Sequence, residues 1–399
     1  MRNPSDFGSS TAKESKSVIS SVASVRQCDR SPTAMRGSSH GKTNFCFYLG
    51  NYLVDFKIYS LNFLCVKILL AVCLIGSLQF FAKAVAADNA IKPFLPIFGT
   101  PLKAAKMPQK VVERALVELG RTLYHEKRLS RDNSISCNSC HDTVGYGVDG
   151  EKFSLGFDGH LTGRNSPTSF NAFMHVAQFW DGRAPTVEEQ AKGPILAGGE
   201  MAMPSADAVV EKLNKIDGYK ALFEAAFPKS DPPITYDNVG KAIGAYERLF
   251  VTPGPLDLLL GGKDDALSEV EKRGLQKFVT TGCVSCHTGN LLGGISYQKL
   301  GVVKPWPNQK DQGRYDLTKN EAEKMFFKVP SLRNIAKTGP YFHDGSATTL
   351  KQAVQMMATH QLGRELSNED VSDIVAFMKS LTGKLDPAIA APPKTFPGI

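Results

Sequence analysis

Two short cysteine motifs constrain this 399-residue chain more than any other feature of its sequence. The run CNSCH occupies residues 137–141, and the run CVSCH occupies residues 283–287. Two cysteines three residues apart with an adjacent histidine can hold zinc, form a redox-active dithiol or attach a haem. The chain must build a different core around a zinc ion, a dithiol or a haem, so the identity of the group at each motif constrains the fold.

The spacing of the motifs favours covalent haem. A zinc site combines cysteine pairs about 15 to 20 residues apart, whereas here most of a domain separates the pairs. A thioredoxin-like dithiol needs a βαβ pattern, which the sequence lacks. On a helical turn both sulfurs share a face, so they can form thioethers with one haem while the next histidine binds iron. We therefore predict two haems c, held by Cys137, Cys140 and His141 and by Cys283, Cys286 and His287.

The remaining cysteines and most of the net charge lie in the first 87 residues. Those cysteines are Cys28, Cys46, Cys65 and Cys73, so the main body has no spare cysteine for a disulfide framework. Residues 1–87 hold ten lysines and arginines against four acidic residues, which is six of the net charge of +8. The rest of the chain is close to neutral, so no nucleic acid partner is expected.

The segment 66–87, VKILLAVCLIGSLQFFAKAVAA, has the features of a secretory signal peptide: a lysine, an apolar run and small residues at its end. A membrane-spanning helix is the alternative. The apolar run is shorter than the roughly 20 residues of a span and contains Gly76, Ser77 and Gln79. We therefore expect export to the periplasm. Residues 1–65 are predicted to be a non-native or disordered extension, produced by a start site assigned too far upstream.

Helical patterns dominate from about residue 105, so the fold class is predicted to be mainly α. Residues 109–125 place Val112, Leu116, Leu119 and Leu123 on one helix face. Strand-like alternation is scarce. Capping patterns predict three further helices, which begin at Thr186 with Glu189, at Ser268 with Glu271, and at Ser367.

An internal repeat divides the chain. SPTSFNAFMHVAQFWDGRAPT at 166–186 aligns without gaps on VPSLRNIAKTGPYFHDGSATT at 329–349, with seven identities in 21 positions. Each copy follows one CxxCH motif. The repeat therefore predicts two related domains, 88–252 and 253–399, each with one haem.

Two longer stretches carry a family resemblance. GRNSPTSFNAF…QFWDGRAPTVEEQAKGPILAGGEM and PSLRNIAKTGPYFHDGS…AVQMMATHQLG resemble the bacterial dihaem cytochrome c peroxidases, over roughly residues 100–384. The resemblance implies two cytochrome-c-like domains that enclose a calcium ion. It implies an electron-transfer haem in the C-terminal domain that feeds a peroxidatic haem in the N-terminal one. The expected reaction is reduction of hydrogen peroxide to water by a small cytochrome c or a copper protein, and the expected assembly is a homodimer.

The same resemblance implies roles for individual residues. Met357 corresponds to the thioether ligand that closes the second haem iron. Glu200 corresponds to the acid–base group that moves a proton between the peroxide oxygens, and Gln190 to an amide that orients peroxide. Trp180 corresponds to a tryptophan between the haems, and the repeat aligns it with His343, so both rings are expected to face the domain interface. The calcium ligands correspond to Asn165, Thr338 and Pro340.

Each of these residues also has an ordinary structural explanation. A methionine on an amphipathic helix is usually core filler, and spacing alone does not separate Met357 from Met356. A single glutamate such as Glu200 is usually a solvated surface residue. Trp180 can be buried simply for packing. The resemblance, not the spacing, favours the functional interpretation in each case.

One position departs from the family pattern. Many members carry a histidine after a glycine in the loop before RNSPT, and this histidine caps the peroxidatic haem at rest. Here Gly156 is followed by Phe157, which cannot bind iron, and the nearest histidine is His160. Either the loop shifts so that His160 takes the role, or the peroxidatic haem is open without reductive activation. We favour the second interpretation.

Two other functions compete with peroxidase activity. A related dihaem enzyme matures the tryptophan tryptophylquinone cofactor of a partner protein, and it has a tyrosine where Met357 stands here. The second alternative is a dihaem electron carrier with no enzymatic activity. A carrier requires six-coordinate irons and gives Glu200 no role.

Overall fold

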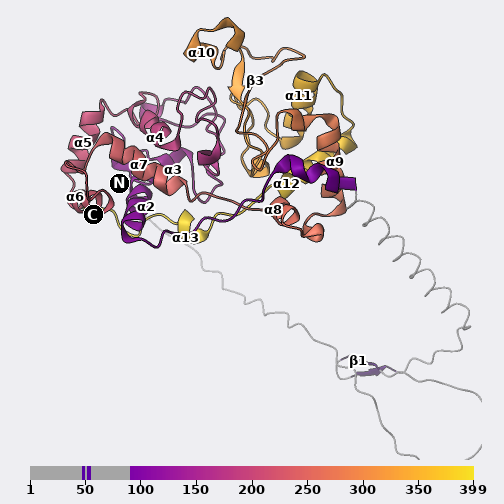
Figure 1. Cartoon of the computed structure of the whole chain (residues 1–399), viewed down its shortest axis with the longest axis horizontal. Coiled ribbons are helices and arrows are strands. Elements are labelled where there is room, and N and C mark those ends of the chain that lie inside the picture. Colours follow the sequence, from indigo (N-terminus) through magenta and orange to yellow (C-terminus); the bar gives the residue numbers. More distant parts are fainter. Residues whose placement is uncertain (1–46, 50–51, 55–89) are drawn as a thin grey trace, which may run out of the picture. The chain divides into compact units, whose positions relative to one another are not determined.

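The computed structural model describes residues 47–49, 52–54 and 90–399 (Figure 1). The first two segments are strands β1 (Phe47–Leu49) and β2 (Tyr52–Val54), which pair antiparallel. The predicted signal peptide at 66–87 lies outside the described residues, and so does the predicted extension at 1–65 apart from these two strands. Within the described residues, every helix is too short or too polar to cross a membrane.

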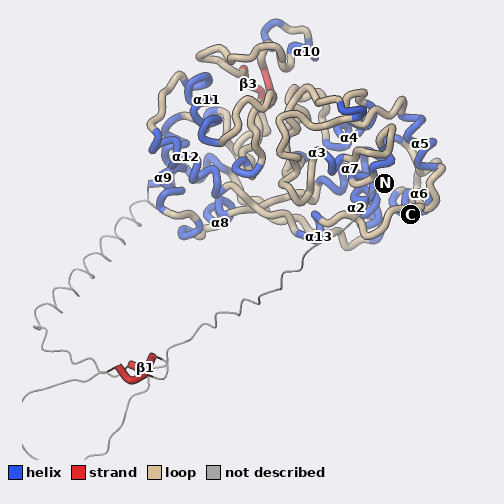
Figure 2. Tube along the Cα trace, turned by 180° about the vertical axis from the view of Figure 1, so that it is seen from behind, coloured by secondary structure: helices blue, strands red, loops and turns tan. Residues whose placement is uncertain are grey.

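Helices joined by long loops make up most of residues 90–399, which confirms the mainly α fold (Figure 2). The first half contains η1 (Lys92–Phe98), α2 (Val111–Tyr124), η2 (Lys127–Leu129), α3 (Cys137–Cys140), η3 (Phe157–Gly159), η4 (Ala172–Met174), α4 (Val187–Leu196), α5 (Ala206–Asn214), α6 (Tyr219–Ala226) and α7 (Tyr236–Glu247). The second half contains α8 (Pro255–Leu260), η5 (Asp264–Ala266), α9 (Glu269–Thr281), η6 (Cys283–Ser285), α10 (Tyr315–Thr318), η7 (Glu321–Glu323), η8 (Ile335–Lys337), α11 (Leu350–Leu362), α12 (Asn368–Ser380) and α13 (Pro387–Ala390). Strands β3 (Tyr297–Lys299) and β4 (Phe326–Lys328) form a short antiparallel pair.

The predicted helix starts are confirmed. The side chains of Thr186, Ser268 and Ser367 accept hydrogen bonds from backbone N–H groups of the first turns of α4, α9 and α12. At Ser268 the bond is reciprocal, because Glu271 accepts from the Ser268 N–H at 2.7 Å. These caps satisfy N–H groups that a helix leaves unpaired at its start.

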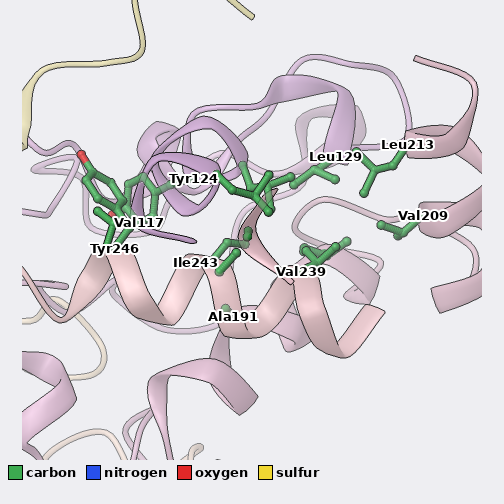
Figure 3. Close-up of a cluster of buried hydrophobic side chains, with 14 of the residues drawn as sticks. Val117, Tyr124, Leu129, Ala191, Val209, Leu213, Val239, Ile243 and Tyr246 are labelled. Atoms are coloured by element: carbon green, nitrogen blue, oxygen red, sulfur yellow. The ribbon is translucent and has the colours of Figure 1, made fainter. Parts of the chain in front are cut away.

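The first hydrophobic core lies where α2 and α4 pack on α7. Val117 and Tyr124 of α2 approach Ile243 and Tyr246 of α7, and Ala191 of α4 lies beside them (Figure 3). Burying these side chains supplies the main stabilising term of this half, at about 25 cal/mol for each Å² of apolar surface removed from water.

The predicted apolar face of α2 is only partly correct. Leu119 and Leu123 are buried as predicted, and Leu116 is half-buried. Val112, however, is 46% exposed, and Val117 is buried in the core instead. Val112 lies in the first turn of α2 and is not among the residues that form the first core.

Both halves contain a close helix crossing at a glycine. A methyl group added to Gly120 of α2 would lie 1.8 Å from the carbonyl oxygen of Ala242 in α7. A methyl group added to Gly274 of α9 would lie 1.9 Å from the carbonyl oxygen of Asp373 in α12. The second core, which includes Phe278, forms around this second crossing. The matching geometry supports two related domains.

We expect Gly274→Ala to destabilise the folded protein by about 1–3 kcal/mol, because α9 and α12 must move apart to admit the methyl group. Denaturant unfolding followed by circular dichroism measures the change. Gly198→Ala is the matched control, since a methyl group there meets no atom within 4 Å. Equal stabilities of the two variants would contradict a need for glycine at the crossing.

The two repeat copies share an uncommon backbone conformation and a hydrogen-bond partner. Asn171 and Asn334 adopt left-handed φ angles of 62° and 61°. The Nδ2 atoms of both donate to the hydroxyl of Thr252, at 2.8 Å each. Thr252 is fully buried, so this one hydroxyl joins the two copies. The domain boundary itself, at 252/253, stays a prediction.

The N-terminal end of the 90–399 segment packs in the second core, and its C-terminal end packs in the first core. Ile91 and Phe98, in and just before η1, pack in the second core. Ile389 of α13 packs in the first core, and its carbonyl oxygen accepts a hydrogen bond from the Tyr246 hydroxyl at 2.7 Å. Each core is therefore completed by residues from the opposite end of the segment.

Candidate functional site

The first CxxCH motif forms the short helix α3, and Ser136 is the N-cap residue directly before it. The Ser136 N–H donates to the hydroxyl of Ser139 at 3.0 Å and so caps the turn. His141 follows directly, and its Nδ1 lies 3.3 Å from the carbonyl oxygen of Gly147. Because Nδ1 carries the proton in this bond, Nε2 keeps the lone pair that an iron ligand needs.

The second motif follows the same plan. Its cysteines lie on and just after the turn η6, which starts after Gly282, the left-handed residue that ends α9. His287 donates from Nδ1 to the carbonyl oxygen of Leu292 at 2.9 Å, so its Nε2 is also available. Burial lowers the pKa of both His141 and His287, which keeps the imidazoles neutral near pH 7.

Each motif lines a cavity, 137–141 in the first half and 283–287 in the second. Burial raises the pKa of Cys140 and of Cys283 to about 11, so neither thiol is a thiolate near neutral pH, unlike the cysteines of a reactive dithiol. Paired sulfurs and a histidine with a free Nε2, lining a common cavity, fit a haem c at both motifs. The second cavity is largely apolar, with Phe278, Leu332, Val354, Ile374 and Met378 in its lining.

Gln190 and Glu200 both line the cavity of the first motif. Gln190 lies on α4, and Glu200 lies in the loop that follows this helix. Burial raises the pKa of Glu200 above its ordinary value, and the positive charge of Arg183 opposes that rise. A carboxyl group with a raised pKa exchanges protons more readily near neutral pH, as an acid–base residue requires.

Glu247 is a further carboxyl in this cavity, and no pattern in the sequence predicted it. It lies on α7 and is buried. Burial raises its pKa to about 8, and the nearby charge of Glu188 adds to the rise. A glutamate in a helical pattern is usually on the surface, so only the position of α7 against α4 reveals its burial.

Trp180 lines both cavities, and its ring lies near that of His343. The ring centroids are 6.3 Å apart, edge to face. The backbone supports this pair symmetrically: the Asn165 N–H donates to His343 O, and the Lys328 N–H donates to Trp180 O, each at 2.8 Å. The structure thus brings the two aligned rings of the repeat together between the halves. Electron transfer through Trp180 stays a prediction.

Met357, on α11, lines the cavity of the second motif together with His287. Met356 does not line this cavity, since adjacent residues on a helix point about 100° apart. The structure therefore distinguishes two methionines that the spacing alone could not separate.

The three residues predicted to bind calcium, Asn165, Thr338 and Pro340, line the second cavity. Asn165 donates from Nδ2 to the Glu151 carbonyl oxygen at 2.9 Å, which leaves its Oδ1 available. Among the described residues, no three histidine, cysteine or acidic side chains gather as a metal site. Calcium here would depend on amide and carbonyl oxygens, which suit a hard cation. The calcium site stays a prediction.

The loop from Gly156 to His160 keeps its histidine away from the cavity. His160 is exposed, and its Nδ1 lies 3.0 Å from the carbonyl oxygen of Phe157. Phe157 packs on the first core beneath the guanidinium of Arg131, 5.5 Å from its ring. The Phe157 N–H donates to Glu200 O at 2.8 Å, so this loop rests on the loop of the predicted acid–base residue. Neither side chain lines the cavity.

Two family models match the chain: di-haem cytochrome c peroxidase over residues 114–265 and cytochrome c over residues 271–382. The cytochrome c551 peroxidase of Pseudomonas aeruginosa is 42% identical over 303 residues, 74% of this chain and 86% of that protein. The methylamine utilization protein MauG of Methylophilus methylotrophus is 34% identical over 281 residues, 66% of this chain and 82% of that protein. The crystal structure of a MauG-like protein associated with microbial copper homeostasis has a TM-score of 0.62 and 27% identity, and the match covers 74% of this chain and 96% of that one.

Proposed function

This chain belongs to the di-haem cytochrome c peroxidase family, and from that premise we propose that it reduces hydrogen peroxide to water in the periplasm. Peroxide takes up two electrons and two protons and yields two waters. The electrons come from a small c-type cytochrome or a copper protein. The observation that carries the proposal is the shared cavity of Glu200, Gln190 and the first haem motif.

The haem at the first motif supplies the iron that activates peroxide and the route by which electrons reach it. The Gln190 amide donates a hydrogen bond that orients peroxide. The Glu200 carboxylate takes a proton from one peroxide oxygen and returns it to the other, so that water leaves instead of hydroxide. The burial that raises the pKa of Glu200 adapts this carboxyl to exchanging protons.

The second haem motif delivers electrons. His287 and Met357 would be the ligands of its iron, and methionine–histidine ligation would raise the haem potential and close the iron to substrate. Trp180, which lines both cavities, lies on the path from this haem to the first. Asn165, Thr338 and Pro340 would supply the oxygen ligands of a calcium ion. The active protein is a homodimer, exported by the signal peptide at 66–87.

Steady-state consumption of peroxide with reduced cytochrome c tests this function. A plain electron carrier would show no turnover. The similarity to MauG makes oxidative maturation of a partner protein the second candidate. Met357 favours the peroxidase, because the maturation enzymes have tyrosine at this position. Turnover with a small donor, in the absence of any partner protein, distinguishes the peroxidase from both alternatives.

We expect the oxidised protein to show one high-spin and one low-spin ferric signal by electron paramagnetic resonance. His160 is exposed and Phe157 cannot bind iron, so the first haem would keep an open position at rest. Met357 as a ligand would keep the second haem low-spin. The half-reduced protein, in which only the second haem is reduced, serves as the comparison. Two low-spin signals in the fully oxidised protein would contradict the open site.

A further inference from the structure

Lys328, at the end of β4, is a buried cation with no carboxylate within ion-pair distance among the described residues, although the negative charge of Asp181 is near enough to act on it. The residue is 6% exposed, and its Nζ forms no ion pair within 4.0 Å in the described part of the chain. Nζ instead lies 3.0 Å from Nδ1 of His175. Burying a charge is costly unless an opposite charge compensates it. An anion from outside the polypeptide would remove that cost.

His175 supplies a second unpaired donor. An ammonium group can only donate, so Nδ1 of His175 accepts and the imidazole proton sits on Nε2. That Nε2 is buried and has no hydrogen-bond partner among the residues that the structure describes. Gly294 provides the room for the ring, since an added methyl group would lie 2.5 Å from His175 Cδ2. Nζ therefore keeps N–H groups for an acceptor outside the ring, while the Nε2–H points away from them on the opposite side of the imidazole.

The repeat relates this pair to the predicted calcium ligands. Subtracting residue 166 from residue 329 gives an offset of 163, which aligns Asn165 with Lys328 and His175 with Thr338. The matched 2.8 Å backbone bonds at Asn165 and Lys328 show the same relation in space. The predicted calcium ligands Asn165 and Thr338 therefore correspond by the repeat to Lys328 and His175. Where the first pair offers oxygen atoms to a cation, the second pair contains the charged side chain of Lys328.

The position of the pair identifies the anion. Lys328 and His175 both line the cavities of both haem motifs. Haem carries propionate carboxylates, which suit a buried and positively charged N–H donor. We propose that Lys328 Nζ, positioned by its hydrogen bond to His175 Nδ1, binds a haem propionate where the two cavities meet. The proposal requires haem at the motifs but no peroxide chemistry, so it goes beyond the proposed function.

Binding a propionate has a consequence for the haem. A propionate keeps Lys328 charged, whereas burial in its absence lowers the pKa of this ammonium to about 7, even though the charge of Asp181 opposes the fall. A fixed positive charge near the haem favours the reduced iron, which carries one positive charge fewer. The pair therefore raises the midpoint potential of the haem whose propionate it holds.

Lys328→Met in the haem-loaded protein tests the proposal. Pyridine haemochrome analysis counts the haems, and a spectroelectrochemical titration measures both midpoint potentials. We expect two haems per chain and a lower potential for at least one of them. Lys328→Arg, which keeps the charge, should stay close to the original potential. Lys324→Met is the matched control, because Lys324 is a partly exposed lysine paired with Glu321 and should change neither potential.

Unchanged potentials in Lys328→Met with both haems attached would overturn the proposal. A crystal structure of the unmodified haem-loaded protein gives an independent decision if the methionine variant fails to fold. A propionate oxygen at about 2.7–2.9 Å from Nζ supports the proposal. Contact of Nζ with water, a free anion or protein groups alone refutes it. Neither measurement uses peroxide turnover, so failure here is distinct from failure of the peroxidase function.

Discussion

Replacing Glu200 by glutamine should lower kcat for peroxide reduction by about 10²–10⁴-fold, the range over which a positioned acid–base group contributes. Glutamine has the same shape and still forms hydrogen bonds, but it cannot take and return a proton. The haem motif and Gln190 stay unchanged in the same cavity. Binding of a neutral substrate such as peroxide should suffer less than the chemical step. Steady-state kinetics with reduced cytochrome c measure the loss.

The pH profile gives this prediction a second readout. The carboxylate must be ionised to accept the first proton, so the rate should fall as pH falls through the pKa of Glu200. Burial raises that pKa, so the fall begins at a higher pH than for a free glutamate. The acidic limb should vanish in Glu200→Gln.

Glu189→Gln is the control for the charge change. Glu189 lies on α4 beside Gln190, but its side chain is 52% exposed and pairs with Lys192. The peroxidase activity of the Glu189→Gln variant should stay within about twofold of that of the unmodified protein, since changes at exposed sites have small effects. If Glu200→Gln kept nearly full activity with both haems attached, the proton would have to move through another group. Glu247, a buried carboxyl of the same cavity with a raised pKa, would be the first to examine.

Met357→His should lower the midpoint potential of the second haem by a substantial part of the roughly 0.8 V that axial ligands span. A thioether ligand raises the potential, and exchanging sulfur for imidazole nitrogen removes that effect. Each ~59 mV lost makes electron uptake about tenfold less favourable. A drop of about 0.12 V therefore costs about 100-fold in the equilibrium with the donor. Redox titration and turnover with reduced cytochrome c measure the two effects.

Met356→Leu is the matched control, because this neighbouring methionine does not line the cavity. Its potentials should equal those of the unmodified protein. A drop in Met356→Leu with none in Met357→His would reverse the assignment of the ligand. No change in either variant would show that the second iron has a different sixth ligand.

Local chemistry made part of this structure predictable. A cap such as Ser268 with Glu271 acts within one helical turn, so the sequence alone identifies it. The CxxCH motifs fix their own turns in the same way. The repeat also revealed that Trp180 and His343 occupy matching loops, although the 6.3 Å between their rings required the structure.

Features that depend on distant segments were not predictable. Val112 fits the apolar face of its helix, yet it is 46% exposed and does not belong to the first core. Lys328 reads as an ordinary surface lysine until the fold places His175 against it, 153 residues away in sequence. Glu247 is similar, since its burial depends on how α4 packs. A single sequence contains no direct record of which segments meet.

The exchange of chain ends between the cores affects how the two redox centres stay together. Phe98 belongs to the second core and Ile389 to the first, so cutting the backbone near residue 252 would not release either half as a complete unit. In such a nicked protein, the segment that contains Phe98 and the segment that contains Ile389 would each still pack in the core of the other half. A cell that makes this chain therefore obtains its two centres in a fixed one-to-one ratio that survives a single proteolytic cut at their junction.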